Sequence, residues 1–272
     1  MVVSAFTPGV FGRIDQSAKR SGAVTGRNIS ALQSAYWLLV VSGFFEPVLY
    51  LFAIGYGLGG LINAIPIGGG RIVTYPEFVA PAMLASSAMA GALSESTFNF
   101  FGKMKFAKQY DAVLATPVRP MEIALGELWW AMARGALYSA AFLVIMVFKG
   151  LTDVPGAIGA FAATLLIGFA FGCLGMAVST FMTSWQDFDL IATIQVALFL
   201  FSATFTPLAL LKPEWLRWVV EVSPLYHSVV VVRDFTLGTV DWEILWHVGF
   251  LAVMAAAGLT IASRRMAALL LK

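Results

Sequence analysis

Residues 156–182 read GAIGAFAATLLIGFAFGCLGMAVSTFM, and this stretch decides the fold because it contains no Asp, Glu, Lys or Arg. A membrane-spanning helix needs roughly 20 mostly apolar residues, so this segment is long enough to cross a bilayer. The whole 272-residue chain has the same character, since 60% of its residues are hydrophobic and 12% are charged. This composition excludes a soluble globular domain. Continuous apolar runs also argue against a membrane β-barrel, whose strands alternate polar and apolar residues.

Apolar segments of spanning length recur along the chain, and we predict six of them. They cover about Tyr36–Gly57, Phe78–Phe101, Ala124–Phe148, Gly156–Met182, Leu190–Leu211 and Ile244–Ala262. Basic residues concentrate in residues 1–33, in residues 102–123 and at the C-terminus, which six spans place on the same side of the membrane. By the positive-inside rule, that side is the cytoplasm.

We therefore predict an all-α polytopic membrane protein with both termini in the cytoplasm. Residues 1–33 form a cytoplasmic tail with an interfacial helix, residues 34–265 form the six-span domain, and residues 266–272 form a short tail.

Several classes of chemistry are not expected of this chain. It contains no G-x-x-x-x-G-K-[ST] motif and so has no P-loop with which to hydrolyse a nucleotide. His227 and His247 are far apart in sequence and have no cysteine partner, so a metal site is not expected. The net charge of +2 is too small to suggest nucleic-acid binding.

Charged residues inside the predicted spans are candidates for function. Glu46 lies near the middle of the first predicted span, where a carboxylate costs about 2.5–3.5 kcal/mol on insertion scales. It should face the interior of the bundle, either in a structural pair or on a transport path. Glu95 in the second predicted span and Arg134 in the third are natural partners if their helices place them at similar depth.

The cytoplasmic segment Lys105–Thr116 predicts a short amphipathic helix that ends before Pro117. One face carries Phe106, Tyr110, Val113 and Leu114. Either this is a simple interfacial helix, or it passes force from a soluble partner to the membrane. In the second case its exposed apolar face would anchor in a hydrophobic cleft of the partner.

The segment after the fifth predicted span contains two short apolar pieces separated by Pro224, and neither is long enough to span. This pattern suggests a re-entrant or interfacial cap, with an ordinary loop lying flat on the membrane as the alternative. Trp215, Trp218, Trp242 and Trp246 would lie at the headgroup level, and Arg233 would stay near water.

Short motifs that run in order from about Arg27 to Arg265 resemble those of a known family. They are Phe45-Glu46-Pro47, Gly55-Tyr56-Gly57-Leu58-Gly59, Tyr75-Pro76-Glu77-Phe78, Tyr110-Asp111-Ala112-Val113-Leu114-Ala115-Thr116-Pro117, Gly126-Glu127-Leu128, Thr204-Phe205-Thr206-Pro207-Leu208, Trp215-Leu216, Ser223-Pro224-Leu225-Tyr226-His227 and Arg233. The sequence is similar to the type-2 ATP-binding-cassette exporter permeases, in particular to their nodulation-protein-J-like branch. One departure is Ala203-Thr204, where the family pattern has Ser-Gly, which puts a local turn in doubt.

The resemblance implies a permease in a bacterial inner membrane that pairs with a second permease subunit, either the same chain or a sister. Two separate ATPase subunits would bind ATP and Mg, and this chain would bind no cofactor. The coupling residues would be Phe106, Tyr110, Asp111, Val113, Leu114, Thr116 and Pro117. The outer cap, residues 213–237, would include Trp215, Trp218, Pro224, His227 and Arg233. The substrate would be an amphiphile such as a glycolipid, a saccharide or a drug.

Two other classes of protein compete with this interpretation. An ion-coupled secondary transporter would use Glu46 and Glu95, but it would be expected to show inverted repeats, and no convincing repeat is present. An integral membrane enzyme would need catalytic polar groups clustered at one membrane face, whereas those in this sequence are scattered.

Overall fold

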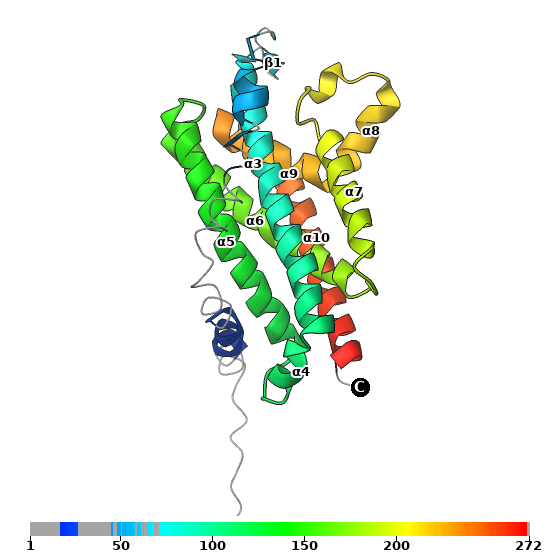
Figure 1. The fold of residues 1–272 in the computed structure, drawn as a ribbon. Helices are drawn as coiled ribbons and strands as arrows, with labels where there is room; N and C mark the ends of the chain where they lie inside the picture. Colours follow the sequence, from blue (N-terminus) through cyan, green and yellow to red (C-terminus); the bar gives the residue numbers. More distant parts are fainter. Residues whose placement is uncertain are drawn as a thin grey trace, which may run out of the picture.

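The computed structural model describes residues 17–26, 45, 48, 49, 51–57, 59, 60, 62, 65–67 and 71–270. Most of these residues are helical, and Figure 1 shows a bundle whose long helices run roughly side by side. After a short helix at residues 17–26, the elements are η1 (Leu51–Tyr56), β1 (Ile65–Ile67), β2 (Arg71–Val73), α3 (Tyr75–Ser94), η3 (Glu95–Asn99), η4 (Gly102–Phe106), α4 (Gln109–Leu114), α5 (Pro120–Phe148), α6 (Val154–Ser179), α7 (Asp187–Leu200), η5 (Leu208–Leu210), α8 (Glu214–Val222), α9 (Pro224–Leu237) and α10 (Ile244–Leu270).

Among the residues that the structure describes, three helices are long and apolar enough to cross a bilayer, namely α5, α6 and the Ile244–Leu269 part of α10. The prediction of a multi-pass helical membrane protein is confirmed at this level. The predicted second span is also helical throughout. Here α3 continues into the wider π-helical turns of η3 and η4, with right-handed helical backbone at Ser94, Phe100 and Phe101.

The helix found for the predicted fifth span is shorter than the expected Leu190–Leu211. The 14 residues of α7 reach about 21 Å, which is less than a hydrocarbon core of about 30 Å. The helix stops because Phe201 leaves the helical region, Ala203 adopts left-handed backbone with φ of 54°, and Pro207 lacks an N–H to donate. The first predicted span, Tyr36–Gly57, lies mostly outside the described residues.

Helix α6 is the axis of the bundle and packs against α3, α5, α9, α10 and η3. Its small residues allow its neighbours to approach closely. A Cβ built on Gly172 would lie 2.9 Å from the Leu128 side chain of α5, and one on Gly175 would collide with Ser96 of η3. On the α10 side the glycine belongs to the neighbour, because Gly258 lies directly against the backbone of Cys173.

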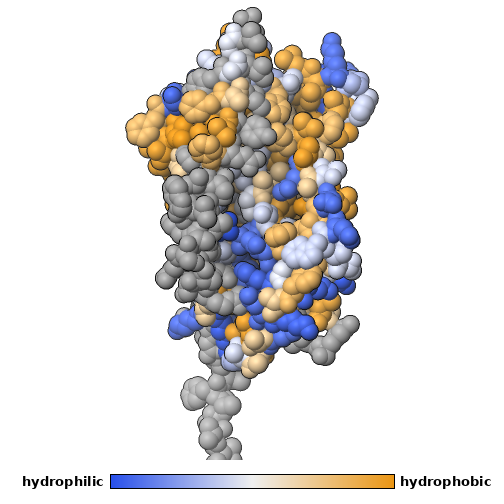
Figure 2. All heavy atoms as spheres, viewed as in Figure 1, coloured by the Kyte–Doolittle hydropathy of each residue, from blue (hydrophilic) through white to orange (hydrophobic). Residues whose placement is uncertain are grey.

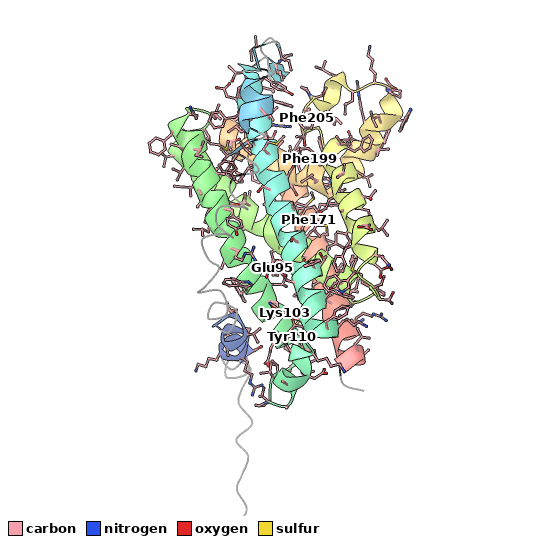
Figure 3. The ribbon with its side chains drawn as sticks, viewed as in Figure 1. Glu95, Lys103, Tyr110, Phe171, Phe199 and Phe205 are labelled. Carbon is pink, nitrogen blue, oxygen red and sulfur yellow. The ribbon has the colours of Figure 1, made fainter. Side chains whose placement is uncertain are left out.

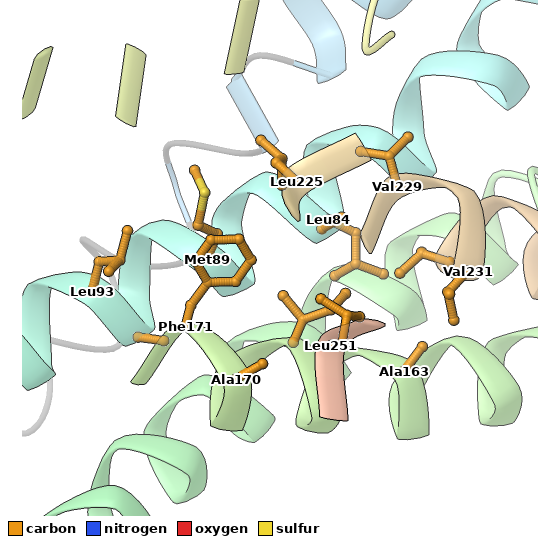
Figure 4. Close-up of a cluster of buried hydrophobic side chains, with 14 of the residues drawn as sticks. Leu84, Met89, Leu93, Ala163, Ala170, Phe171, Leu225, Val229, Val231 and Leu251 are labelled. Atoms are coloured by element: carbon orange, nitrogen blue, oxygen red, sulfur yellow. The ribbon is translucent and has the colours of Figure 1, made fainter. Parts of the chain in front are cut away.

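The apolar core fills the space between α6 and the helices that pack on it. Figure 4 shows buried side chains of α3, α6, α9 and α10 in contact around this axis. The labelled residues are Leu84, Met89, Leu93, Ala163, Ala170, Phe171, Leu225, Val229, Val231 and Leu251.

The two ends of the bundle differ. At the end that we call the cap end, β1 and β2 form an antiparallel hairpin with Ile65 opposite Val73, and α8 leads into α9 (Figure 1). The all-α prediction omitted this hairpin, although two short apolar runs separated by three glycines, residues 65–73, are typical of one. The opposite end, which we call the α4 end, carries α4, the helix at 17–26 and the end of α10.

We predict that Gly258→Ala destabilises the protein. The new Cβ would lie 2.7 Å from the Cys173 carbonyl carbon and 2.8 Å from the Leu174 nitrogen, so α10 must move away from α6. Overpacking of this kind costs about 1–3 kcal/mol, which should exceed the roughly 0.5–1 kcal/mol that alanine gains over glycine in a helix. Thermal unfolding in detergent would measure the change.

The matched control is Gly249→Ala on the same helix. Among the described atoms, nothing lies within 4 Å of a Cβ built on Gly249, so this variant should be neutral or slightly stabilised. Equal melting temperatures for the two variants would contradict the close α6–α10 contact.

Candidate functional site

A cavity of about 610 Å³ lies between α3, η3, α5 and α7. One part of its wall is apolar, with Met83, Met89, Val196 and Phe199. The polar part consists of Ser86, Ser87, Ser94, Glu95, Arg134, Tyr138 and Gln195. Figure 2 shows that hydrophilic residues gather in the half of this face toward the α4 end, whereas the cap end is largely hydrophobic. The cavity can therefore accommodate a molecule that has both polar and apolar parts.

An ion pair forms the polar centre of this cavity. Arg134 Nη1 of α5 donates to Glu95 Oε2 at 2.5 Å, and Asn99 Nδ2 donates to the same oxygen at 2.7 Å. The Glu95 side chain is 7% exposed and the Arg134 side chain 24%. The structure thus joins the two charged residues that the sequence suggested as partners. Glu46, the other candidate in this group, lies outside the described residues.

Glu95 lies where α3 becomes the π-helical segment η3. Ser96 and Thr97, the next two residues, donate their hydroxyls back to the carbonyls of Ala92 and Leu93 at 2.7 Å and 2.6 Å. These bonds satisfy the hydroxyl groups within the helix itself, as an apolar environment requires. Wide turns of this type often occur at functional sites.

Helix α7 closes the cavity on one side but packs loosely. Within the described part of the chain, no residue of α7 is buried, and Leu190, Ile194, Val196 and Leu200 are each about half exposed or more. Sequence analysis missed the role of Gln195, a polar residue in the middle of an apolar helix, which was a usable signal.

Two further ion pairs tie the α4 end together. Lys103 Nζ of η4 donates to Glu127 Oε2 of α5 at 2.6 Å, and Arg20 lies 3.6 Å from Glu122. The helix at 17–26 is pressed onto α5, because a Cβ built on Gly126 would lie 2.6 Å from the Val24 side chain. Figure 3 shows Glu95, Lys103 and Tyr110 following one another along the chain toward the α4 end.

The predicted helix Lys105–Thr116 is two pieces in the structure. η4 ends at Phe106, Lys108 adopts left-handed backbone with φ of 45°, and α4 begins at Gln109. The single-helix prediction was wrong because the chain must reverse direction here to reach α5, and a continuous helix cannot do so.

This break separates the residues that were expected to share one exposed face. Tyr110 is fully buried, with its ring 5.4 Å from that of Phe100, so the expectation that it anchors a partner is wrong in this structure. Val113 and Leu114 pack partly against the same core. The coupling residues that remain exposed are Phe106, Asp111, Thr116 and Pro117.

At the cap end, Arg233 joins α9 to two other elements. Its Nη2 donates to the carbonyls of Phe78 and Ala203, both at 3.2 Å, and its guanidinium lies 3.8 Å from the centre of the Phe78 ring. The expectation that Arg233 stays near water was therefore wrong. A guanidinium that bonds two backbone carbonyls instead holds α9 against α3 and the chain after α7.

The other cap residues lie as follows. Trp215 and Trp218 of α8 are 63% and 72% exposed, and Pro224 begins α9. His227 is 5% exposed, and its Nδ1 lies 2.6 Å from Nδ1 of His247 on α10. Sequence spacing alone gave no sign of this histidine pair, because it is a contact between two helices.

The fold and the cavity define a multi-pass helical membrane protein with a partly polar space between its helices. The family model described as ABC-2 type transporter matches residues 21–237. The chain is 34% identical over 233 residues to nodulation protein J of Rhizobium leguminosarum bv. trifolii, covering 85% of this chain and 86% of that protein. It is 30% identical over 237 residues to nodulation protein J of Rhizobium meliloti strain 1021, with coverage of 86% and 87%. It is also 24% identical over 212 residues to inner membrane transport permease YadH of Escherichia coli K12, with coverage of 78% and 82%.

The chain belongs to the ABC-2 type transporter family, and it is a membrane subunit of an ABC transporter. The resemblance found in the sequence is confirmed.

We predict that Glu95→Ala destabilises the protein because it leaves Arg134 without a counter-ion. Breaking a fully buried pair costs roughly 3–5 kcal/mol, and the loss should be smaller here because the Arg134 side chain is 24% exposed. The double variant Glu95→Leu, Arg134→Leu should recover most of this loss, since no buried charge remains. Thermal unfolding in detergent would measure both; a double variant as unstable as Glu95→Ala would contradict the pairing.

We also predict that acidification weakens the contact between α9 and α10. Burial lowers the pKa of His227 to about 4, whereas an exposed histidine titrates near pH 6.5. The unfolded chain therefore binds more protons between about pH 6.5 and pH 4, so stability falls as the pH is lowered through this window. His227→Gln should reduce the fall in melting temperature between pH 7.5 and pH 5. An unchanged fall would assign it to another group.

Proposed function

We propose that this chain is the permease subunit of an ATP-driven ABC exporter that moves an amphiphilic substrate, such as a glycolipid, a saccharide or a drug, out of the cytoplasm of a bacterial cell. Six spans cross the inner membrane in this proposal, and both termini lie in the cytoplasm. Membership of the ABC-2 type transporter family supports the role, and one relative is described as an inner membrane transport permease.

The distribution of exposed charge supports a cytoplasmic α4 end. Exposed basic residues gather there from segments far apart in sequence, namely Lys19, Lys105, Lys108, Arg119 and Arg264. The cap end carries the exposed acids Glu214, Glu221, Asp241 and Glu243. Cytoplasmic loops of membrane proteins carry an excess of Lys and Arg, which favours this orientation.

The observation that carries the proposal is the continuous helical path from the α4 end to the cavity. Phe106 and Glu95 lie on one uninterrupted course through η4 and η3, and Lys103 between them is paired with Glu127 of α5. A displacement of η4 would therefore move η3 and α5 together, because the Glu95–Arg134 pair joins these two walls of the cavity. Packed helices transmit such movement because their side chains leave little free space.

In this mechanism two separate ATPase subunits bind ATP and Mg, and their closure pushes on the α4 segment of each permease. A second permease subunit, identical or a sister chain, would face the loosely packed α7. The cavity suits an amphiphile because apolar residues of α3 and α7 face serines, Tyr138 and the ion pair. This chain itself would hold no cofactor.

The alternative, an ion-coupled secondary transporter, receives less support. It depends on intramembrane carboxylates that gain and lose protons or ions. Glu95 already has Arg134 as a counter-ion and Asn99 as a hydrogen-bond donor. A carboxylate that is already engaged by these two partners is less available to bind a transported ion.

We predict that Ala112→Arg on the exposed side of α4 blocks association with the separate ATPase subunit of the proposed exporter. The side chain is bulky and charged and would obstruct docking, while the fold should be unaffected because Ala112 is exposed. Ala268→Arg, an exposed alanine of α10 at the same end, is the matched control. Co-purification and ATP-driven export in vesicles would be measured. Wild-type export by Ala112→Arg would refute the coupling role of α4, and uptake driven by an ion gradient without any ATPase would favour the alternative.

A further inference from the structure

Two histidines that are 20 residues apart in sequence meet at the cap end of the bundle. His227 lies in the first turn of α9 and His247 in the first turn of α10, and their Nδ1 atoms are 2.6 Å apart. Their separation in sequence argued against a metal site. The fold removes that argument, because it places two imidazole nitrogens from different helices against each other.

The contact joins two atoms that can each be a donor or an acceptor. A neutral imidazole has one N–H donor and one acceptor nitrogen. The pair can therefore form a hydrogen bond only if Nδ1 carries the proton in one ring and lacks it in the other. If both rings carry the proton on Nε2 instead, two Nδ1 lone pairs converge, and neutral imidazole nitrogens of this kind are the commonest metal ligands in proteins.

The two rings differ in how firmly they are held. His227 is 5% exposed and its ring stacks on Phe250, with centroids 4.0 Å apart at an interplanar angle of 23°. The Tyr226 ring meets both imidazoles edge-on, at 5.8 Å and 6.0 Å between centroids. His247 is less buried than His227 and has more room to adjust.

Only a small adjustment separates the hydrogen-bonded pair from a metal-binding pair. Histidine nitrogens bind Zn²⁺ at about 2.0–2.1 Å, so two of them on a tetrahedral ion are about 3.3 Å apart. The Nδ1 atoms of His227 and His247 must therefore separate by roughly 0.7 Å from their 2.6 Å contact. A small rotation of the His247 ring provides this distance while His227 stays in place.

Glu243 is positioned to supply a third ligand. It lies four residues before His247, and the helical turn extends back to it because the Trp246 N–H donates to the Glu243 carbonyl at 3.0 Å. Residues four apart on a helix share one face. The Glu243 carboxylate is exposed, forms no ion pair or hydrogen bond within the described part of the chain, and acts electrostatically on both Tyr226 and His247.

The third ligand must move to complete the site. Among the described residues, no three potential metal ligands are grouped closely enough to hold an ion. Rotation of the free Glu243 side chain toward the two histidines would complete such a group. Two histidines, one glutamate and a water molecule form a known tetrahedral coordination shell of Zn²⁺.

The chemistry of these ligands selects a class of metal ion. Imidazole suits Zn²⁺, Cu²⁺ and Ni²⁺, whereas Mg²⁺ and Ca²⁺ prefer shells made of oxygen ligands. The exposed acids of the cap end, Glu214, Glu221, Asp241 and Glu243, also raise the local concentration of cations.

We propose that His227, His247 and Glu243 form a binding site for a divalent transition-metal ion of the Zn²⁺ class, with water as the fourth ligand. The ion would join α9 to α10, two helices that already pack against each other. It would be a structural ion at the cap end, where it would hold the short helix α9 to the long helix α10, and it would have no part in ATP hydrolysis.

The test uses the full-length permease in detergent, without a polyhistidine tag and after removal of metals with a chelator. Excess ZnCl₂ should raise the melting temperature by about 3 °C or more, because a ligand that binds only the folded state stabilises it. EDTA should reverse the rise. MgCl₂ and CaCl₂ at the same concentration should give no rise, because they bind imidazole poorly.

Three variants assign the ligands. His227→Gln and His247→Gln should each abolish the rise in melting temperature. Glu243→Gln, at an exposed position where the fold should be unaffected, should weaken Zn²⁺ binding by about tenfold or more in a calorimetric titration. The matched control is Glu214→Gln, an exposed acid in the first turn of α8 at the same end, which should leave the affinity unchanged.

The other outcomes overturn the proposal. A rise that survives both histidine variants, or that CaCl₂ also produces, would assign the binding to surface acids. An unchanged affinity in Glu243→Gln would exclude the three-ligand site even if the histidine variants do not fold. No rise in the wild-type protein would exclude a metal site altogether. None of these results bears on the proposed function, because the test involves neither an ATPase nor a transported substrate.

Discussion

The structure depends on close helix approach to α6, which glycines permit on α6 itself or, toward α10, on the neighbouring helix. Gly159 leaves room for the Phe235 ring of α9, Gly172 for Leu128 of α5 and Gly175 for Ser96 of η3. Inside a bilayer, burial of apolar area supplies little driving force between helices, because lipid is as apolar as the helix surface. Dense packing must therefore stabilise the bundle, and glycines permit it. This packing places α6 at the centre, with α3, α5, α9 and α10 around it.

Because α6 carries no charged residue from Gly156 onward, the charged side chains of the bundle lie on other helices. Glu95, Arg134 and Gln195 lie on the side where α3, α5 and α7 enclose the cavity. There each charge needs an internal partner or water, because an unpaired charge in an apolar region is expensive. The Glu95–Arg134 pair meets this requirement while leaving polar groups available to a substrate. The bundle thus separates a densely packed apolar axis at α6 from a polar side that α7 closes loosely.

Much of the helical architecture could be predicted from the sequence, because apolar length and charge position follow directly from bilayer thickness and hydration. The bounds of α5 and α6 lie within a few residues of the predicted spans, and the two short helices split at Pro224 are present. The predictions failed where a local backbone choice decides the outcome. Lys108 adopts left-handed backbone and breaks the predicted helix Lys105–Thr116. Ala203 also adopts left-handed backbone, in the irregular chain that follows α7. Neither residue is a glycine, so nothing in the sequence indicated this conformation.

Side-chain periodicity identified an apolar face in residues 105–116 but could not say what covers it. Tyr110 on that face is buried in the core of its own chain, and Arg233 at the other end bonds two backbone carbonyls. Phe106 on the same face stays 60% exposed, and its ring stacks on that of Trp185, which is 41% exposed. Their stacking joins two loops that sequence reasoning treats separately. For this reason the side chains that a membrane subunit leaves exposed become visible only in its tertiary packing, whereas its spans are already visible in its composition.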